Sequence, residues 1–146
     1  MRYVEWYGEC YMSMKTVNIA LVDDENDVGF LYRALLKKQI KSQECELHFF
    51  NAAQKFLDYL EVGEKKDEIL ILITDINMPN IDGFTLLGIV EKQYPQLELY
   101  ISSAYGSNEY KEKANTFNIK GFIEKPINLD RIRKIVQNKF VQINKN

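Results

Sequence analysis

Several protein classes are excluded by what this sequence has little of. Its two cysteines, Cys10 and Cys45, have no metal-ligand spacing and are too few for a disulfide framework. No apolar run approaches the ~20 residues that cross a bilayer, and the N-terminus lacks the basic and apolar regions of a secretory signal. Charge of neither sign dominates, because 19 basic and 21 acidic side chains leave a net charge of −2, so no overall field recruits nucleic acid. These absences favour a globular cytoplasmic protein that does not contact a membrane.

Histidine is almost absent, since His48 is the only one in the chain. It lies in "ECELHFF" (44–50), where the alternation predicts a half-exposed edge strand with Cys45, Leu47 and Phe49 inward and His48 outward. We therefore interpret His48 as an ordinary surface residue rather than a base or a metal ligand.

Strand-like and helix-like segments alternate along the 146 residues, a length that suits one domain. Continuous apolar runs such as "VNIALV" (17–22) and "ILILIT" (69–74) are typical of strands buried on both faces. Five strand–helix units with short connections predict an α/β fold with a parallel sheet and helices on both faces. The expected strands are 17–22, 44–50, 69–74, 97–102 and 119–124. The expected helices run over about 27–39 and 52–61, from Phe84 to before Pro95, from Ser107 or Asn108, and from a cap at Asn128.

Residues 1–15 differ from the rest, with three tyrosines, the only tryptophan and no clear period. We interpret them as an N-terminal tail, either disordered or an extension left by a vector or an upstream start codon, with the domain spanning 16–146. The alternative is an aromatic segment that docks on the domain or on a partner.

Chemically capable residues stand at the carboxyl ends of four of the five expected strands. In an open α/β sheet, the loops at this edge surround the ligand crevice. The first strand is followed by the acidic "DDE" (23–25), the third by Asp75, the fourth by "SSA" (102–104), and the fifth by Lys125 and Pro126. The apolar third strand is therefore expected to hold Asp75 in a fixed position at this edge of the sheet.

Gathering Asp23, Asp24 and Asp75 in one place would be costly without a cation, because the carboxylates repel one another. Oxygen ligands without histidine or cysteine favour Mg²⁺. A metal beside a carboxylate, a lysine and a hydroxyl is typical of a site for phosphoryl transfer, in which Lys125 neutralises phosphoryl oxygens. Asp75 is best placed as the nucleophile that forms an acyl phosphate. Taken alone, Asp23 and Asp24 would be better interpreted as a cap of the first helix, but beside Asp75 and Lys125 the metal site is the better interpretation.

The four strand-end motifs, in this order and spacing, resemble the receiver domain of two-component response regulators, including the chemotaxis regulators. The motifs are "DDE", "DINMPNIDG" (75–83), "SSA" and "KP", and the resemblance covers about residues 16–143. Each motif is weak alone, but four of them at four strand ends are specific together. The resemblance implies a three-layer, doubly wound flavodoxin-like (βα)5 fold with strand order 2-1-3-4-5.

The same resemblance implies roles for individual residues. Asp75 would accept the phosphoryl group from a phosphohistidine. Asp24 and Asp75 would bind Mg²⁺ directly, Asp23 mainly through water, and Asn77 through its backbone carbonyl.

Further implied roles concern the response to phosphorylation. Lys125 would pair with a phosphoryl oxygen, and its bond to Pro126 resembles the cis peptide of the family. Ser103, rather than its neighbour Ser102, would move inward to bond the phosphate, and Phe122 matches the aromatic switch residue that rotates with it. Serine replaces the commoner threonine at 103, and phenylalanine replaces the frequent tyrosine at 122.

The resulting hypothesis is a phosphorylation-dependent signalling switch in a two-component system or phosphorelay. It is not a conventional enzyme, although it would catalyse its own phosphorylation and dephosphorylation. The expected phosphodonor is a sensor histidine kinase or a histidine phosphotransfer protein. A downstream protein would bind an output face made of the fourth helix, the fifth strand and the fifth helix, and a phosphorylation-dependent homodimer is a further option. We expect no nucleic-acid binding by this domain, which is either a stand-alone receiver or a fragment of a larger regulator.

Other interpretations are open at this stage. One alternative is a receiver fold that serves as a docking module without phosphorylation. An aspartyl-phosphate hydrolase would have an aspartate two positions after the nucleophile, where this chain has Asn77. A flavodoxin-like cofactor binder is disfavoured because "DDEND" (23–27) would repel phosphate without a metal. Asp82 and Gly83 are interpreted as a turn and helix cap. A basic run on the last helix is interpreted as a solvated face or part of the output surface: Arg131, Arg133, Lys134 and Lys139.

Overall fold

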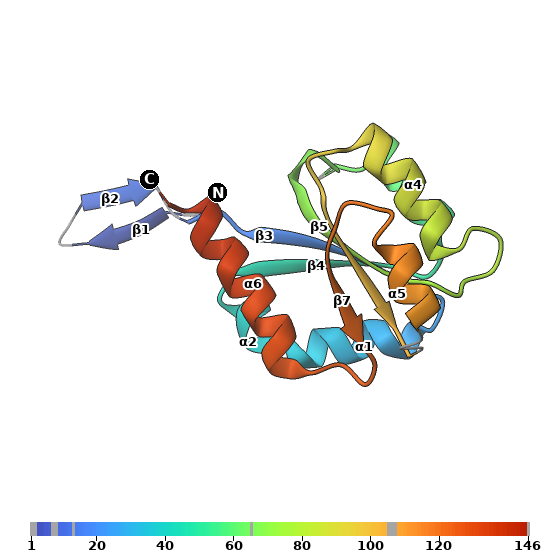
Figure 1. Cartoon of the computed structure of the whole chain (residues 1–146). Coiled ribbons are helices and arrows are strands. Elements are labelled where there is room, and N and C mark those ends of the chain that lie inside the picture. The colour runs from blue at the N-terminus through green and yellow to red at the C-terminus, as the bar shows by residue number, and fades with distance from the viewer. Residues whose placement is uncertain (1–2, 7–8, 13, 65, 105–107, 146) are drawn as a thin grey trace.

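The computed structural model describes residues 3–6, 9–12, 14–64, 66–104 and 108–145. Among these residues, a parallel sheet has the strand order β4-β3-β5-β6-β7 (Figure 1). Its strands are β3 (Val17–Val22), β4 (Cys45–Phe50), β5 (Ile69–Asp75), β6 (Glu98–Ser103) and β7 (Ile119–Glu124). Taken in chain order these strands follow the order 2-1-3-4-5, so the expected flavodoxin-like fold is confirmed.

Helices cover both faces of the sheet and give the fold its three layers (Figure 1). One face packs against α1, α2 and α6, and the opposite face packs against α3, α4 and α5. The bounds are α1 (Asn26–Leu35), α2 (Lys37–Lys41), α3 (Ala53–Val62), α4 (Gly83–Gln93), α5 (Asn108–Ala114) and α6 (Leu129–Ile143), with a short 3-10 turn η1 (Lys66–Glu68).

The central strand β5 contributes to both cores, which explains its continuous apolar sequence. Leu72 packs in the core beneath α3, α4 and α5, whereas Ile71 and Ile73 pack in the core beneath α1 and α6. All three side chains are 2% exposed or less, and burying each contributes about 1.5–3 kcal/mol. The strand is thus held from both sides up to Asp75, its last residue.

The helix expected over 27–39 is interrupted at Leu36, which lies between α1 and α2. Its backbone (φ −100°, ψ 14°) leaves helical geometry, yet its N–H still donates to the carbonyl of Tyr32. The side chain of Leu36 is fully buried. A sequence pattern does not predict this bend, because the bend depends on how the turn packs against the sheet.

The prediction that His48 lies on a solvent face is wrong, although β4 is an edge strand as expected. The His48 side chain is 15% exposed, its Nε2 lies 2.9 Å from Oδ1 of Asn18, and its ring lies 5.9 Å from that of Tyr59 on α3. The reason is that α3 covers this face of β4, which the alternation within one strand cannot reveal.

The first fifteen residues contain two short strands, β1 (Tyr3–Trp6) and β2 (Glu9–Met12), which pair with each other in antiparallel fashion. The interpretation of this segment as a tail stays a prediction.

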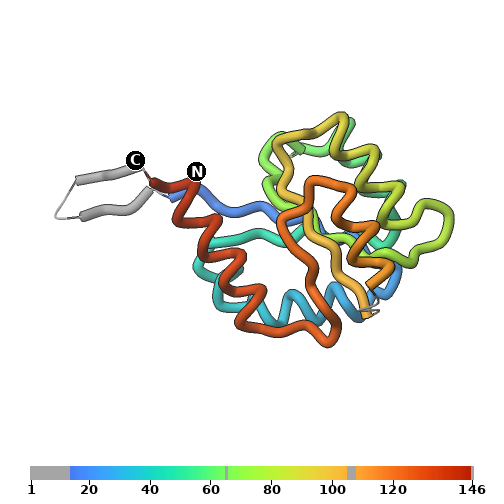
Figure 2. The backbone as a smooth tube through the Cα atoms, viewed as in Figure 1, coloured from blue at the N-terminus to red at the C-terminus, as the bar shows by residue number. Residues whose placement is uncertain are grey.

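The beginning of β3 and the end of α6 lie side by side, which the chain trace makes clear (Figure 2). The side chain of Asn144 accepts a hydrogen bond from the backbone N–H of Lys15 and donates one to its carbonyl. A single amide side chain therefore ties together two positions 129 residues apart. None of the described helices is long and apolar enough to cross a membrane.

Candidate functional site

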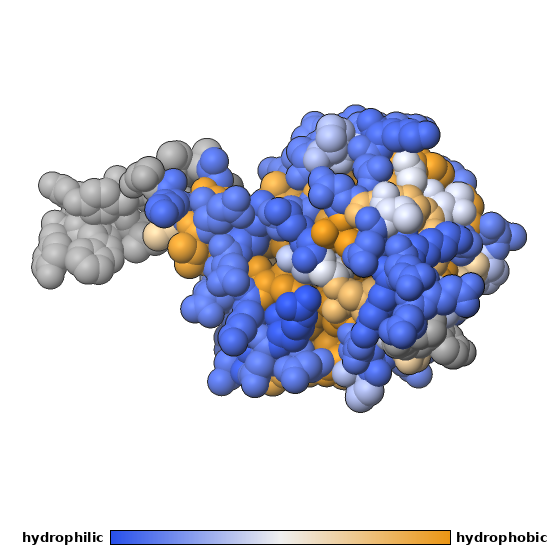
Figure 3. Space-filling model, in the orientation of Figure 1, coloured by the Kyte–Doolittle hydropathy of each residue, from blue (hydrophilic) through white to orange (hydrophobic). Residues whose placement is uncertain are grey.

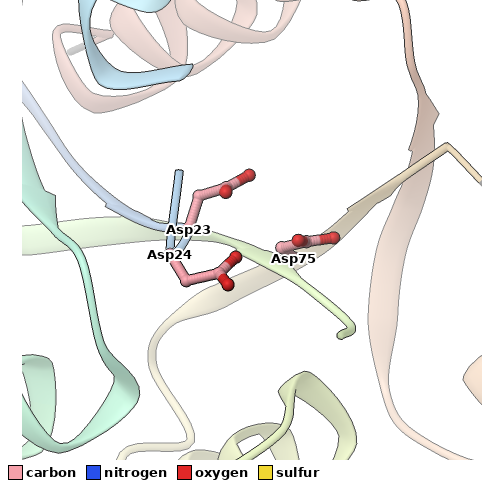
Figure 4. Close-up of side chains that lie close together, drawn as sticks. All are labelled: Asp23, Asp24 and Asp75. Atoms are coloured by element: carbon pink, nitrogen blue, oxygen red, sulfur yellow. The ribbon is translucent and has the colours of Figure 1, made fainter. Parts of the chain in front are cut away.

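Three carboxylates converge at the carboxyl edge of the sheet. Asp23 and Asp24 follow β3, and Asp75 ends β5, the strand beside it. Each offers an oxygen, and these oxygens all lie within 4.8 Å of one another. Figure 4 shows the three side chains projecting into the same space. The carboxyl ends of adjacent parallel strands meet at one edge, so the sequence predicted this convergence.

The three aspartates differ in their exposure to solvent. Asp23 is only 1% exposed, Asp75 is half-buried and Asp24 is exposed. A buried carboxylate needs hydrogen-bond partners, and Asp23 has two: its Oδ1 accepts from the backbone N–H of Glu25 at 2.9 Å, and its Oδ2 from Nζ of Lys125 at 2.8 Å. Asp23 is therefore fixed, whereas Asp24 is accessible to solvent and to a ligand.

Lys125 brings the positive charge of the site from the end of β7. Its Nζ lies 2.8 Å from Asp23 and 3.7 Å from Oδ2 of Asp75. Burial alone would lower the pKa of Lys125, but the hydrogen bond and charge of Asp23, together with the charge of Asp75, outweigh burial and raise that pKa. Lys125 is therefore a firmly charged ammonium, and its peptide bond to Pro126 is cis, as the resemblance implied.

Asp75 sits in a field that disfavours its negative charge. Burial raises its pKa most, and the charges of Asp23 and Asp24 raise it further. The charge of Lys125 and a hydrogen bond from the N–H of Ile76 lower it, but they do not compensate fully. One ammonium thus faces three carboxylates, and a cation with a preference for oxygen ligands would relieve the imbalance. The donor set fits Mg²⁺.

The other predicted site residues lie around this cluster. Ser103 ends β6 and is 1% exposed, and its backbone carbonyl accepts from the N–H of Lys125 at 3.0 Å. Asn77 is exposed in the loop that follows Asp75. Phe122 lies on β7, half-buried against the core beneath α3, α4 and α5, with Nζ of Lys111 6.0 Å from its ring centroid. The roles assigned to these residues stay predictions.

Asp82 and Gly83 have the structural roles expected of them. Asp82 is the N-cap of α4, and its Oδ1 accepts from the N–H of Thr85 at 2.8 Å. Gly83 also packs in a way that the sequence did not reveal. A Cβ at this position would collide with the backbone carbonyl oxygen of Asp75, so the absence of a side chain allows α4 to begin directly against the strand end.

Two buried hydroxyls lie near the site: that of Tyr32 was missed from the sequence, and that of Ser102 was considered only as the alternative to Ser103. Tyr32 on α1 is fully buried and Ser102 on β6 is 2% exposed. Neither hydroxyl has a hydrogen-bond partner among the described residues. Leaving a buried polar group unsatisfied costs about 1–3 kcal/mol. No signal in the sequence singles out Tyr32, because a tyrosine within a helix is ordinary.

This fold and this cluster of carboxylates point to the class of receiver domains. The model of the response regulator receiver domain family matches residues 19–137, and the chain belongs to that family. Membership supports a phosphorylation-dependent role in two-component signalling.

Curated relatives are similar to this chain at moderate identity. The DNA-binding transcriptional regulator NtrC of Proteus hauseri is 27% identical over 124 residues, which are 85% of this chain and 24% of that protein. The two-component response regulator ARR12 of Arabidopsis thaliana is 28% identical over 123 residues, 83% of this chain and 19% of that protein. The chain thus spans a quarter or less of these relatives.

Solved structures are similar in fold. A CheY-like receiver domain protein from Methanospirillum hungatei JF-1 matches with a TM-score of 0.74 at 20% identity, covering 90% of this chain and 98% of that one. The chemotaxis protein CheY4 of Vibrio cholerae matches with a TM-score of 0.71 at 20% identity, covering 84% and 98%.

Proposed function

We propose that this receiver domain is a switch in which Asp75 accepts a phosphoryl group from a phosphohistidine. The observation that carries the proposal is the contact of Lys125 with both Asp23 and Asp75, inside a cluster of three carboxylates. Asp23, Asp24, Asp75 and the backbone carbonyl of Asn77 would hold Mg²⁺, with Asp23 acting mainly through water. When bound, this ion supplies neutralisation of the charge on the transferring phosphoryl group.

The transfer forms one bond and breaks another. A carboxylate oxygen of Asp75 attacks phosphorus, the bond from phosphorus to the imidazole nitrogen of the donor breaks, and the nitrogen keeps the electron pair. The product is an acyl phosphate on Asp75 and a free histidine on the donor. Hydrolysis by water later returns the carboxylate and releases phosphate. The protein contributes position and charge, which dominate catalysis of phosphoryl transfer.

Lys125 is the residue that responds first in this proposal. A phosphoryl group adds about 1.5 to 2 negative charges at neutral pH, next to an ammonium only 3.7 Å from Asp75. We expect Lys125 to turn from Asp23 toward a phosphoryl oxygen, while the hydroxyl of Ser103 donates a hydrogen bond to another. Phe122 would then rotate inward behind Ser103.

The output face of the proposal consists of α5, β7 and α6, the fourth and fifth helices and the fifth strand of the expected fold. Figure 3 shows this side of the molecule with hydrophilic side chains along α6 and apolar ones exposed between α6 and α5. A cleft of about 260 Å³ lies against α6, and its lining includes Lys120, Arg131 and Lys134. Such a surface suits a downstream protein, or a second copy of the chain after phosphorylation.

The partners and setting belong to the same proposal. The donor would be a sensor histidine kinase or a histidine phosphotransfer protein in the cytoplasm, with no membrane or direct nucleic-acid contact by this domain. The domain would be a stand-alone receiver or a fragment of a larger regulator. The competing proposal is a docking module that works without phosphorylation.

Intact-mass spectrometry after incubation with acetyl phosphate tests the proposal. We expect one added phosphoryl group that requires Mg²⁺, is absent in Asp75→Asn and is retained in Asp67→Asn, a matched exposed aspartate on η1. A short-lived adduct can escape detection, so binding of beryllofluoride, a phosphoryl mimic, is measured by ¹⁹F NMR in parallel. Failure of both assays in the natural sequence would leave the docking module as the better account.

A further inference from the structure

Tyr32 carries a hydroxyl that the fold does not use. Its ring packs with Ile71, Ile73 and Ile123 in the core beneath α1 and α6, where an apolar side chain of similar size would serve. The phenol is fully buried and its oxygen lacks a hydrogen-bond partner among the described residues. A buried hydroxyl without a partner is unusual in a native protein, so it requires a reason.

Ser102 presents a second unused hydroxyl to the same core. It is 2% exposed, and its Oγ likewise has no partner in the described part of the chain. The two hydroxyls are neighbours, because Ser102 is near enough to lower the pKa of Tyr32 and so offset part of the rise that burial causes. The charge of Asp23 also acts on this pKa. The phenol oxygen therefore lies near Ser102 and within the influence of Asp23, but it makes no regular hydrogen bond with the described residues.

Ser102 connects this pair to the proposed phosphorylation site in two ways. It is the register partner of Asp75 on the neighbouring strand. It also directly precedes Ser103, the hydroxyl expected to move toward a phosphorylated Asp75. Successive residues of a strand point to opposite faces, so a displacement of Ser103 also moves Ser102 within the core that holds Tyr32.

We infer that Tyr32 and Ser102 form a hydroxyl pair whose hydrogen bond closes when Ser103 moves inward, so that Tyr32 is a positioning residue for the activated state. This inference rests on the proposed function. In the state described here the two hydroxyls are buried and unpaired, and this raises the free energy of that state. Closing the bond in the activated state would remove that penalty and link α1 to the end of β6.

A double-mutant cycle tests the pair, with Tyr32→Phe, Ser102→Ala and the double variant. Affinity for beryllofluoride in the presence of Mg²⁺ is measured by ¹⁹F NMR titration, and the stability of the unliganded chain by urea denaturation. Each single variant is expected to bind beryllofluoride about fivefold more weakly, the effect of one ordinary hydrogen bond. The double variant is expected to bind no more weakly than either single one, and none should lose stability without the ligand.

Tyr100→Phe is the matched control. Tyr100 lies two residues before Ser102 on β6, half-buried against the same core, and its removal should leave the affinity unchanged. Equal affinities in all variants would overturn the inference, as would additive losses accompanied by an equal loss of unliganded stability, which mark a purely structural role. Absence of beryllofluoride binding by the natural sequence would instead contradict the proposed function.

Discussion

Replacing Lys125 by methionine keeps the length of the side chain and removes the ammonium that faces Asp23. The two side chains are 18% and 2% exposed, and 2.8 Å separates Nζ from Oδ2. At an effective dielectric constant of 20, this separation corresponds to an attraction of about 6 kcal/mol. Desolvation of both charges offsets part of that attraction, and breaking a buried pair from one side costs about 3–5 kcal/mol. We expect Lys125→Met to lose that much unfolding free energy without Mg²⁺.

Urea denaturation measures this loss, and a second substitution identifies its cause. If the loss comes from an unpaired buried carboxylate, adding Asp23→Asn to Lys125→Met should recover most of it, because the charge then disappears. Saturating Mg²⁺ should also restore stability, since a ligand that binds only the folded state stabilises it. A loss below about 1 kcal/mol, the level of an exposed ion pair, or no recovery with Asp23→Asn, would refute the reasoning.

Three further predictions concern individual residues. Gly83→Ala should lower the thermal midpoint of unfolding strongly, because the added Cβ would collide with the carbonyl of Asp75. The control Gly88→Ala should leave the midpoint unchanged or raise it, because the nearest atom to its Cβ is 3.7 Å away. Similar midpoints for the two variants would contradict the packing argument. Asp75→Asn should raise the stability of the metal-free chain to urea at pH 7, because a pKa raised by folding means that the ionised carboxylate opposes folding. With Mg²⁺ present, the natural sequence should instead be more stable than the variant. A variant less stable than the natural sequence without metal would contradict this sign. Burial, and to a lesser extent the charge of Glu44, raises the pKa of Cys45 to about 12. In a Cys10→Ser variant, a thiol reagent at pH 8 should therefore react with Cys45 only as fast as the chain unfolds. Reaction at the rate of a free thiol would disprove this.

Most of the fold was accessible from the sequence because each strand has a distinct pattern. The run from Ile69 to Ile73 indicated a strand buried on both faces, and short connections between alternating elements indicated a parallel sheet. The interruption of the helix at Leu36 and the burial of His48 beneath α3 could not be predicted from the sequence. Both depend on which helix packs over which strand, and that information is not contained in a single element.

The convergence of the site was predictable for a topological reason. Parallel strands end at the same edge, so Asp23, Asp24 and Asp75 had to meet once β3 and β5 were neighbours. Gly83 and Tyr32 were not identified, because a glycine at a turn and a tyrosine in a core are both ordinary in sequence. Their significance depends on distances to the carbonyl of Asp75 and to Ser102, which only the folded chain contains.

The two hydrogen bonds between Asn144 and the backbone of Lys15 hold the start and the end of the domain side by side. A linker of a few residues would join these two positions with little loss of chain entropy, since loop closure becomes cheap when the ends already touch. New ends could then be opened elsewhere, for example at Glu64 after α3, an exposed residue outside the helices and strands. A circular permutant of this kind would keep the acidic pocket intact while moving the attachment point of any fused module to another side of the sheet.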